Sequence, residues 1–344
     1  MAGFDDVHMH LLSGARQLDD IDLSAARNPR EIAVAIRACA AARPDEGWVV
    51  GRGWLYAAFP DGLPTRSRLD PLVPDRPALI TAYDGHSAWA NSRALEAAGV
   101  RHDTPDPPNG TILRDPASGE PSGALLEEAV LLVENRLPLP SREQDLAALR
   151  RAIAAVQLTG ITSVQEAWSS TEDVPVWRDL VGRGELTLRA RLALPMKPEV
   201  DLPTWREQLL AFTAEVSGLA AGRWLWGGIL HGEPSPNQAT AWADQIGPQR
   251  AALAWAAGTI SRAGGRLAFG SDWPVVPFNP FLGLQVAVNR QTPRSTATRR
   301  LDPGRSGLAP LGAGCVHARF GLRRTSGTLE RDDPCRAAGR PGDP

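Results

Sequence analysis

The chain has 344 residues, of which 43% are hydrophobic and 22% charged, and its formal net charge at pH 7 is -2. This composition is typical of a folded protein with one large or two medium domains, and it excludes a disordered chain. The near-balanced charge disfavours a nucleic-acid partner, and the sequence has no run of about 18 apolar residues that would predict a membrane span.

The cysteines and the first residues bear on the compartment. Cys39, Cys315 and Cys335 show no CxxC spacing, which predicts neither a disulfide framework nor a thiolate zinc cluster and is typical of a reducing compartment. Residues 1–6 are acidic and carry no apolar signal segment. We therefore expect a cytoplasmic protein without membrane association.

The first predicted elements are a helix and two strands. The helix begins after Asn28, whose side chain can cap it, and Ile32 and Ile36 repeat at helical spacing. Residues 48–51 and 78–83 are short apolar segments of the kind that form buried strands.

A turn-rich segment and a capped helix follow. Proline, glycine and asparagine dominate residues 101–123 and predict an inserted β-hairpin at the surface. Ser141 and Gln144 predict a capped helix, which Gly160 ends before a strand over residues 161–164.

The helix-then-strand order is repeated further along the chain. Helices near residues 174–182 and 249–263 precede strands near residues 186–194 and 266–272. Repeated units of this kind favour a parallel sheet or a barrel.

His8 and His10, in the segment His-Met-His, are the first chemical signal. Alternate residues of a strand point to the same side, so the two imidazoles can bind one metal ion. A His-x-His near a terminus also occurs without metal, and purification tags supply histidines as well. The flanking residues 3–6 and 11–14 favour the metal, because with them the segment resembles the end of the first barrel strand of the metal-dependent amidohydrolases.

The second signal runs from Tyr83 to Leu95 and reads YDGHSAWANSRAL. It places His86 just before a helix that Asn91 or Ser92 can cap. A lone histidine here could be purely structural, although loops after strands carry the chemistry of barrels. The whole string resembles a signature of the third amidohydrolase family, the group related to the N-substituted formamide deformylases. The resemblance implies that His86 contacts the substrate or its developing oxyanion.

Asp272, in the segment GSDWP, ends a predicted strand, and Pro274 indicates that the chain leaves the sheet there. Taken alone, such an aspartate could simply cap a turn. In the amidohydrolases that the chain resembles, the aspartate after the last barrel strand binds metal and takes the proton of the attacking water. The resemblance thus implies a divalent metal, expected to be zinc, held by His8, His10 and Asp272, with Asp272 as the catalytic base.

The sequence departs from the family on the middle barrel strands, where the family has a carboxylated lysine and two further histidines. Lys197 lies in the segment PMKP, flanked by prolines, and is typical of a solvated loop lysine rather than a bridging ligand. His231 lies outside any family motif and could be a ligand or an ordinary loop histidine. We therefore expect a family segment to be missing near residues 220–240, and one metal ion at most.

The last residues, 294–344, hold 10 arginines, 8 glycines and 5 prolines and show no apolar periodicity. They predict an irregular, poorly ordered tail, because few large apolar side chains offset the entropy lost on ordering. A basic binding tail is the alternative, although its arginines are scattered rather than gathered on one helical face.

The predicted fold is an incomplete α/β barrel of the amidohydrolase kind over residues 1–293, since about five or six candidate strands stand against the eight that closure needs. The function that the resemblance implies is metal-dependent hydrolysis of a carbon–nitrogen bond, other than a peptide bond, in a small-molecule substrate. The alternative is a truncated, catalytically inactive remnant that binds a ligand or partner without turnover.

Overall fold

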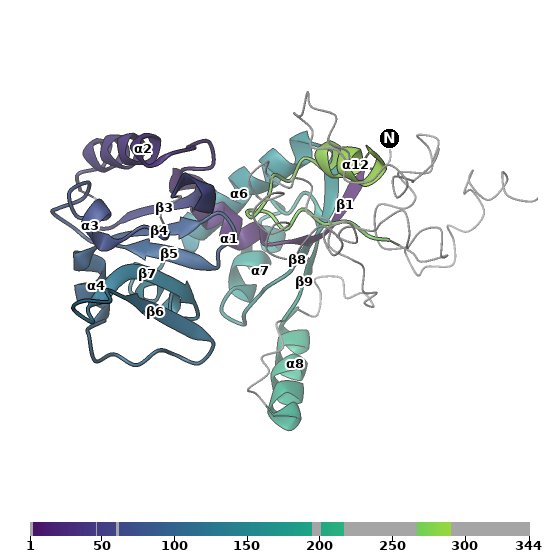
Figure 1. Ribbon diagram of the computed structural model, residues 1–344. Helices are drawn as coiled ribbons and strands as arrows, with labels where there is room; N and C mark the ends of the chain where they lie inside the picture. Colours follow the sequence, from purple (N-terminus) through teal and green to yellow (C-terminus); the bar gives the residue numbers. More distant parts are fainter. Residues whose placement is uncertain (1–2, 46, 60–61, 195–200, 217–266, 290–344) are drawn as a thin grey trace, which may run out of the picture. The chain divides into compact units, whose positions relative to one another are not determined.

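The computed structural model describes residues 3–45, 47–59, 62–194, 201–216 and 267–289 (Figure 1). The chain divides into two compact units. One comprises Met1–Arg16 and Ser141–Pro344 and is called the discontinuous unit; the other, Gln17–Pro140, is called the inserted unit. The inserted unit thus interrupts the discontinuous unit directly after its first strand and helix.

The discontinuous unit is built on a parallel sheet in the order β1–β8–β9. The strands are β1 (Phe4–Met9), β8 (Ile161–Glu166) and β9 (Arg189–Leu192). Met9 pairs with Glu166 and Glu166 with Leu192, so these three residues lie at the same, carboxyl end of the sheet. Parallel neighbours need crossover connections, and helices supply them here.

The described part of this unit has these α-helices: α1 (Leu11–Arg16), α6 (Arg142–Leu158), α7 (Val174–Gly182), α8 (Leu202–Val216) and α12 (Pro280–Asn289). The predicted capping box is confirmed, since Ser141 and Gln144 bond each other's backbone at the start of α6. Gly160 follows the helix with φ +87°, a conformation that glycine adopts without strain. Leu149 of α6 and Trp177 of α7 are fully buried in the core beneath the sheet.

Residues 267–272, predicted as a strand, do not form a regular one. They run beside β1, where the Val7 amide donates to the Phe269 carbonyl (3.2 Å) and the Asp272 amide donates to the His8 carbonyl (2.7 Å). Gly270 permits this approach, because a Cβ there would lie 2.6 Å from the His8 nitrogen. The prediction of a regular strand was therefore wrong. The position of this segment beside β1 nevertheless brings Asp272 to the end of that strand.

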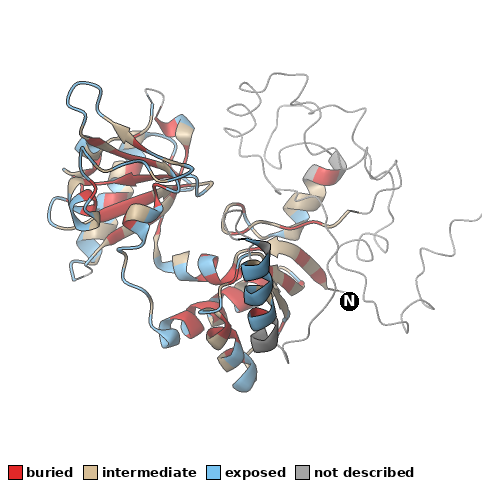
Figure 2. Ribbon diagram, turned by 90° about the horizontal axis from the view of Figure 1, so that it is seen from below, coloured by how far each residue is buried: buried red, intermediate tan, exposed pale blue. Residues whose placement is uncertain are grey.

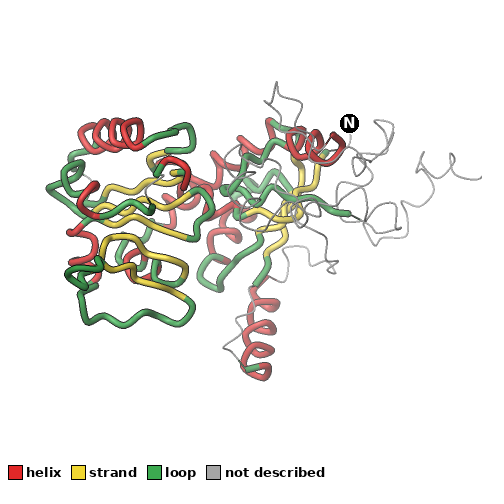
Figure 3. The backbone as a smooth tube through the Cα atoms, in the orientation of Figure 1, coloured by secondary structure: helices red, strands yellow, loops and turns green. Residues whose placement is uncertain are grey.

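The inserted unit has a six-stranded mixed sheet in the order β2–β3–β4–β5–β7–β6. The strands are drawn in yellow in Figure 3. Its strands are β2 (Ile21–Asp22), β3 (Val49–Trp54), β4 (Ala78–Ala82), β5 (Ser87–Ala90), β6 (Gly110–Arg114) and β7 (Pro121–Glu127). The first three run parallel to one another, and the remaining pairs are antiparallel. Its α-helices are α2 (Pro29–Ala42), α3 (Arg66–Leu69), α4 (Ser92–Ala98) and α5 (Leu131–Glu134).

Two predictions for the inserted unit are confirmed and one is corrected. Helix α2 begins after Asn28, whose side chain accepts a bond from the Glu31 amide, and β3 and β4 overlap the predicted apolar strands. The hairpin over residues 101–123 exists as β6 and β7, but it is no surface excursion. Strand β7 lies between β5 and β6, and Leu125 is fully buried, because the apolar residues just past the predicted boundary carry the hairpin into the sheet.

Buried residues follow the strands and the inner helix faces of each unit (Figure 2). The described residues therefore form a mixed α/β protein with one parallel and one mixed sheet. Barrel closure and the single domain over residues 1–293 stay predictions, since residues 217–266 lie outside the described part of the chain. The same holds for Lys197, His231, the predicted helix near residues 249–263, the missing segment near residues 220–240 and the tail 294–344.

Among the helices that the structure describes, none combines the length and the apolar character needed to cross a lipid bilayer.

Candidate metal centre

The two histidines lie where β1 ends. His8 is in the strand, and His10 follows its last residue, Met9, and precedes α1. The His10 amide donates to the Trp273 carbonyl (2.7 Å) and the His10 carbonyl accepts from Gly14 (2.8 Å), so both the segment after Asp272 and the first turn of α1 fix this position. The predicted side-by-side placement of the two imidazoles follows from this strand end, with their rings nearly perpendicular and 5.4 Å apart.

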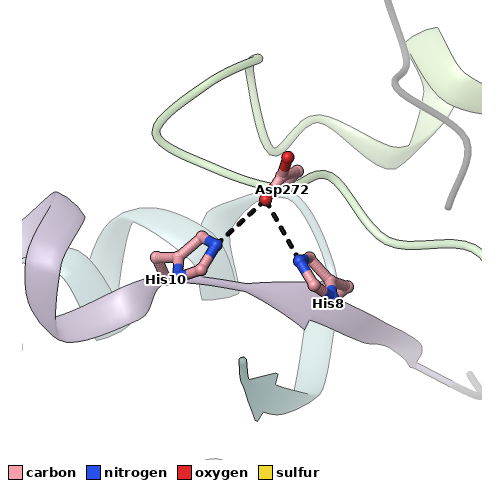
Figure 4. Close-up of side chains that lie close together, drawn as sticks. All are labelled: His8, His10 and Asp272. Atoms are coloured by element: carbon pink, nitrogen blue, oxygen red, sulfur yellow. Dashed lines mark ion pairs between the residues drawn. The ribbon is translucent and has the colours of Figure 1, made fainter. Parts of the chain in front are cut away.

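Asp272, more than 250 positions later in the sequence, lies beside the two imidazoles and completes the candidate ligand group (Figure 4). Its Oδ1 lies 3.2 Å from Nε2 of His8 and 3.1 Å from Nε2 of His10. The backbone of Asp272 is left-handed, with φ +55°, a conformation that costs free energy in a non-glycine residue and is concentrated at functional sites. The side chains are 28%, 26% and 16% exposed in the order His8, His10 and Asp272, so none of the three is fully buried.

The three side chains fit a divalent cation. Their ligand atoms all lie within 4.8 Å of one another. Two ligand atoms on a tetrahedral zinc ion, each at about 2.05 Å, are about 3.3 Å apart, which is close to the observed nitrogen-to-oxygen separations. Two imidazoles and one carboxylate also match a catalytic zinc site, which keeps a position for water or substrate. Within the described ranges, no other group of three or more such side chains converges in this way.

Asp6, which the sequence analysis did not single out, is buried beside this centre with 7% of its surface exposed. Its Oδ1 accepts bonds from the amides of His8 (3.2 Å) and Ser271 (3.1 Å), and its Oδ2 also faces the Ser271 amide (3.2 Å). Burial raises the pKa of this carboxyl to about 6, although the bonds from Ser271 and His8 work in the opposite direction. The available signal was alternation, because positions 6 and 8 of a regular strand point to the same side, although in the structure a register shift between Asp6 and Met9 interrupts the regular pairing.

Glu166 is a second buried carboxyl that was not predicted from the sequence. It ends β8, beside Met9 of β1, and its Oε2 accepts a bond from the Leu12 amide (2.9 Å) just after His10. It is 1% exposed, and burial raises its pKa to about 8. A carboxylate at the carboxyl end of a predicted parallel strand was the signal that could have found it, because barrels place their functional groups there.

His86 lies in the inserted unit, in the turn between β4 and β5. Its Nδ1 is 2.9 Å from Oε2 of Glu127, and its amide donates to Asp84 Oδ1 (3.1 Å). Glu127 ends β7 with φ +51°. Strand β5, which was not predicted, separates His86 from the predicted helix, and of the two predicted caps Asn91 accepts the bond from the Ala94 amide.

The turn around His86 is polar and tied together by short bonds. The Tyr56 hydroxyl lies 2.8 Å from the Ser87 hydroxyl and 3.2 Å from Asp84 Oδ1. Burial raises the pKa of the Tyr56 hydroxyl well above its usual range. Tyr56 therefore keeps its proton and can donate it in a hydrogen bond.

The fold and the site define an α/β protein with a His-x-His and aspartate centre at the carboxyl end of a parallel strand. Residues 1–217 match the family described as "Amidohydrolase family", so the chain belongs to the amidohydrolase family. The resemblance found in the sequence is thereby confirmed.

Relatives of known sequence support this membership. The chain is 36% identical over 180 residues to the putative amidohydrolase YtcJ of Bacillus subtilis (strain 168), covering 52% of this chain and 33% of that protein. It is 34% identical over 180 residues to the protein LONG AFTER FAR-RED 3 of Arabidopsis thaliana, covering 52% and 31%. It is 30% identical over 197 residues to the N-substituted formamide deformylase of Arthrobacter pascens, covering 54% and 36%. The chain thus spans about a third of the length of these relatives.

Solved structures give the same fold. An uncharacterized metal-dependent hydrolase from Pyrococcus horikoshii OT3 superposes with a TM-score of 0.54 at 17% identity, covering 84% of this chain and 74% of that one. Its counterpart from Pyrococcus furiosus gives 0.53 at 16% identity, covering 89% and 79%. These likenesses bear on the fold alone.

Proposed function

We propose that this chain carries the metal centre of a hydrolase that cleaves carbon–nitrogen bonds other than peptide bonds in small-molecule substrates. His8, His10 and Asp272 hold the metal, which we infer to be zinc. The observation that carries the proposal is the convergence of one Asp272 oxygen on both imidazole nitrogens, at separations of 3.2 and 3.1 Å. Membership of the amidohydrolase family supports the reaction class.

A divalent cation held by His8, His10 and Asp272 would supply a Lewis acid and would lower the pKa of a water molecule at the centre. The imidazoles of His8 and His10 direct their Nε2 atoms to one point of the site. Asp272 presents Oδ1 to the same point, while its other oxygen is directed away from the imidazoles (Figure 4). That carboxylate is placed to take the proton of the attacking water and to return it to the departing amine, as a general base and then a general acid.

His86 is proposed as a substrate contact, on the strength of the family signature that surrounds it. The Glu127 carboxylate at Nδ1 (2.9 Å) fixes the orientation of the ring. An imidazole held in this way can donate to a carbonyl oxygen as negative charge develops on it.

Turnover of a panel of N-formyl and N-acyl amines by the zinc-loaded chain tests this function, with product amine measured directly. We expect hydrolysis that Asp272→Asn abolishes, since the amide keeps the shape but cannot take a proton. Glu143→Gln, which alters an exposed carboxylate of α6, is the matched control and should leave the rate unchanged. Zinc binding without any turnover would contradict the enzymatic proposal and favour a chain that binds ligands without hydrolysing them.

A further inference from the structure

Asp6 connects the two chain segments that supply the candidate ligands. Its carboxylate accepts from the amide of His8, which is itself a ligand, and from the amide of Ser271, which precedes the ligand Asp272. Asp6 and Ser271 are 265 positions apart in the sequence. A single buried side chain therefore spans the junction between β1 and the segment 267–272.

We propose that Asp6 is a positioning residue that fixes His8 and Asp272 relative to each other and thereby sets the affinity of the centre for metal. The inference rests on the metal site of the proposed function. Asp6 does not join the ligand group, since the three converging atoms come from His8, His10 and Asp272. Its oxygens instead accept backbone amides, as the outer shell of a metal site does when it holds the ligands in place.

The junction depends on such a restraint. The segment 267–272 forms no regular strand. The bonds from the Val7 and Asp272 amides, together with the bond from the His10 amide to the Trp273 carbonyl, are separate backbone bonds rather than a strand ladder. Asp272 is also held in a left-handed conformation, which persists only where the surroundings enforce it. The Asp6 bonds to Ser271 act on the residue immediately before that backbone, so they restrain the direction in which the Asp272 side chain leaves it.

Burial adds to the cost of losing Asp6. The carboxyl is 7% exposed, so removing it leaves the His8 and Ser271 amides without this acceptor in a place that water reaches poorly. Unpaired amides of this kind recover their bonds by a shift of the backbone. A shift at Ser271 moves Asp272 away from the two imidazoles.

The test compares Asp6→Ala and Asp6→Asn with the parent chain by Zn²⁺ titration and by the visible spectrum of bound Co²⁺. Asparagine keeps an oxygen that can accept both amides, whereas alanine keeps none. We expect Asp6→Ala to bind Zn²⁺ about 10 to 100 times more weakly and to change the Co²⁺ bands. Asp6→Asn should bind Zn²⁺ with an affinity within about tenfold of the parent and retain the parent's Co²⁺ bands. A general loss of stability would not produce this difference between the alanine and asparagine variants.

Asp145→Asn is the matched control in the same unit. Asp145 is also buried, but its two oxygens accept bonds from Arg16 (2.8 Å each), away from the ligand-bearing backbone. This variant should lower the unfolding temperature and leave Zn²⁺ affinity unchanged. An equal loss of affinity in Asp145→Asn and Asp6→Ala would overturn the positioning role.

The remaining outcomes separate the two proposals. A parent chain that binds no Zn²⁺ overturns both the proposed function and the role of Asp6. If the parent and Asp6→Ala bind Zn²⁺ with equal affinity, the role of Asp6 is overturned and the proposed function is not. If Asp6→Ala does not fold, the test rests on Asp6→Asn, in which the His8 and Ser271 amides keep an acceptor. A folded Asp6→Asn chain that binds Zn²⁺ more than about a hundredfold more weakly than the parent overturns the role of Asp6.

Discussion

The two units bury different kinds of polar group. In the discontinuous unit, the buried polar side chains include the ionisable Asp6, Asp145 and Glu166, whereas the buried polar side chains described in the inserted unit are the neutral Ser87 and Asn91. Burying a carboxyl is costly unless it is bonded or protonated, while a neutral amide needs only hydrogen-bond partners. Among the described residues, the buried carboxyls thus belong to the discontinuous unit, and one of them, Asp6, lies beside the candidate ligands.

Asn91 illustrates how a buried polar side chain of the inserted unit is satisfied by hydrogen bonds. Its Oδ1 accepts from the amides of Ala78 and Ala94, and its Nδ2 donates to the carbonyls of Val73 and Arg76. One side chain therefore joins β4, the start of α4 and the loop between α3 and β4. Asp6 makes the corresponding junction in the discontinuous unit with a carboxylate, at the place where the candidate ligands meet.

The largest effect should come from the histidines of the discontinuous unit. Replacing His8 and His10 together with alanine removes two of three ligands, and we expect Zn²⁺ affinity to fall by at least about a thousandfold, or about 4 kcal/mol. His102→Ala changes an exposed histidine of the inserted unit and should have no effect in the same titration. A similar loss in both variants would break the contrast between the units.

Glu166 predicts a pH dependence that belongs to the discontinuous unit. The pKa of this carboxyl is raised from 4.5 to about 8 on folding by burial, so the folded state holds a proton that the unfolded state releases between these values. The free energy of unfolding therefore falls as pH rises from about 4.5 to about 8, by on the order of 4 kcal/mol.

Glu166→Gln sharpens this prediction, because it stays neutral and keeps an acceptor for the Leu12 amide. Chemical denaturation of both chains at pH 5 and pH 8 should show the variant losing most of the slope and being the more stable chain at pH 8. Equal slopes in the two chains would show that Glu166 does not titrate in this range.

Asn91→Ala should give a smaller effect, confined to the inserted unit. The loss of two accepted and two donated bonds at a fully buried position is expected to cost about 2 to 4 kcal/mol of stability. The cost should be the same at pH 5 and pH 8, since no ionisable group is removed, and Zn²⁺ affinity should not change. Asn135→Ala, which follows α5 and is exposed, provides the control for an asparagine without these contacts.

Much of the fold was predictable because it depends on local signals. The caps at Asn28 and Ser141 and the end of α6 at Gly160 are written in adjacent residues, and the structure has them in place. The position of β7 inside the sheet was not predictable, because it depends on pairing with β5, some 35 residues earlier in the chain. The same limit explains why residues 267–272 were predicted as a regular strand.

The residues of the candidate site also differ in whether a local sequence pattern or a contact between distant positions reveals them. The pairing of His8 with His10 follows from strand alternation, whereas the addition of Asp272 came from the family resemblance, since no local pattern connects positions so far apart. Asp6 and Glu166 escaped notice because their roles lie in bonds to the Ser271 and Leu12 amides, which exist only in the folded chain. Burial of a carboxyl beside a ligand is a property of the tertiary structure and not of the motif.

The central claim is that the discontinuous unit holds one divalent metal through His8, His10 and Asp272. Metal content measured by mass spectrometry on the untagged, purified chain tests it most directly, in parallel with the double alanine variant of the two histidines. We expect one divalent metal ion per parent chain and none per variant chain. A parent chain without stoichiometric metal, or a variant that retains it, would contradict the claim.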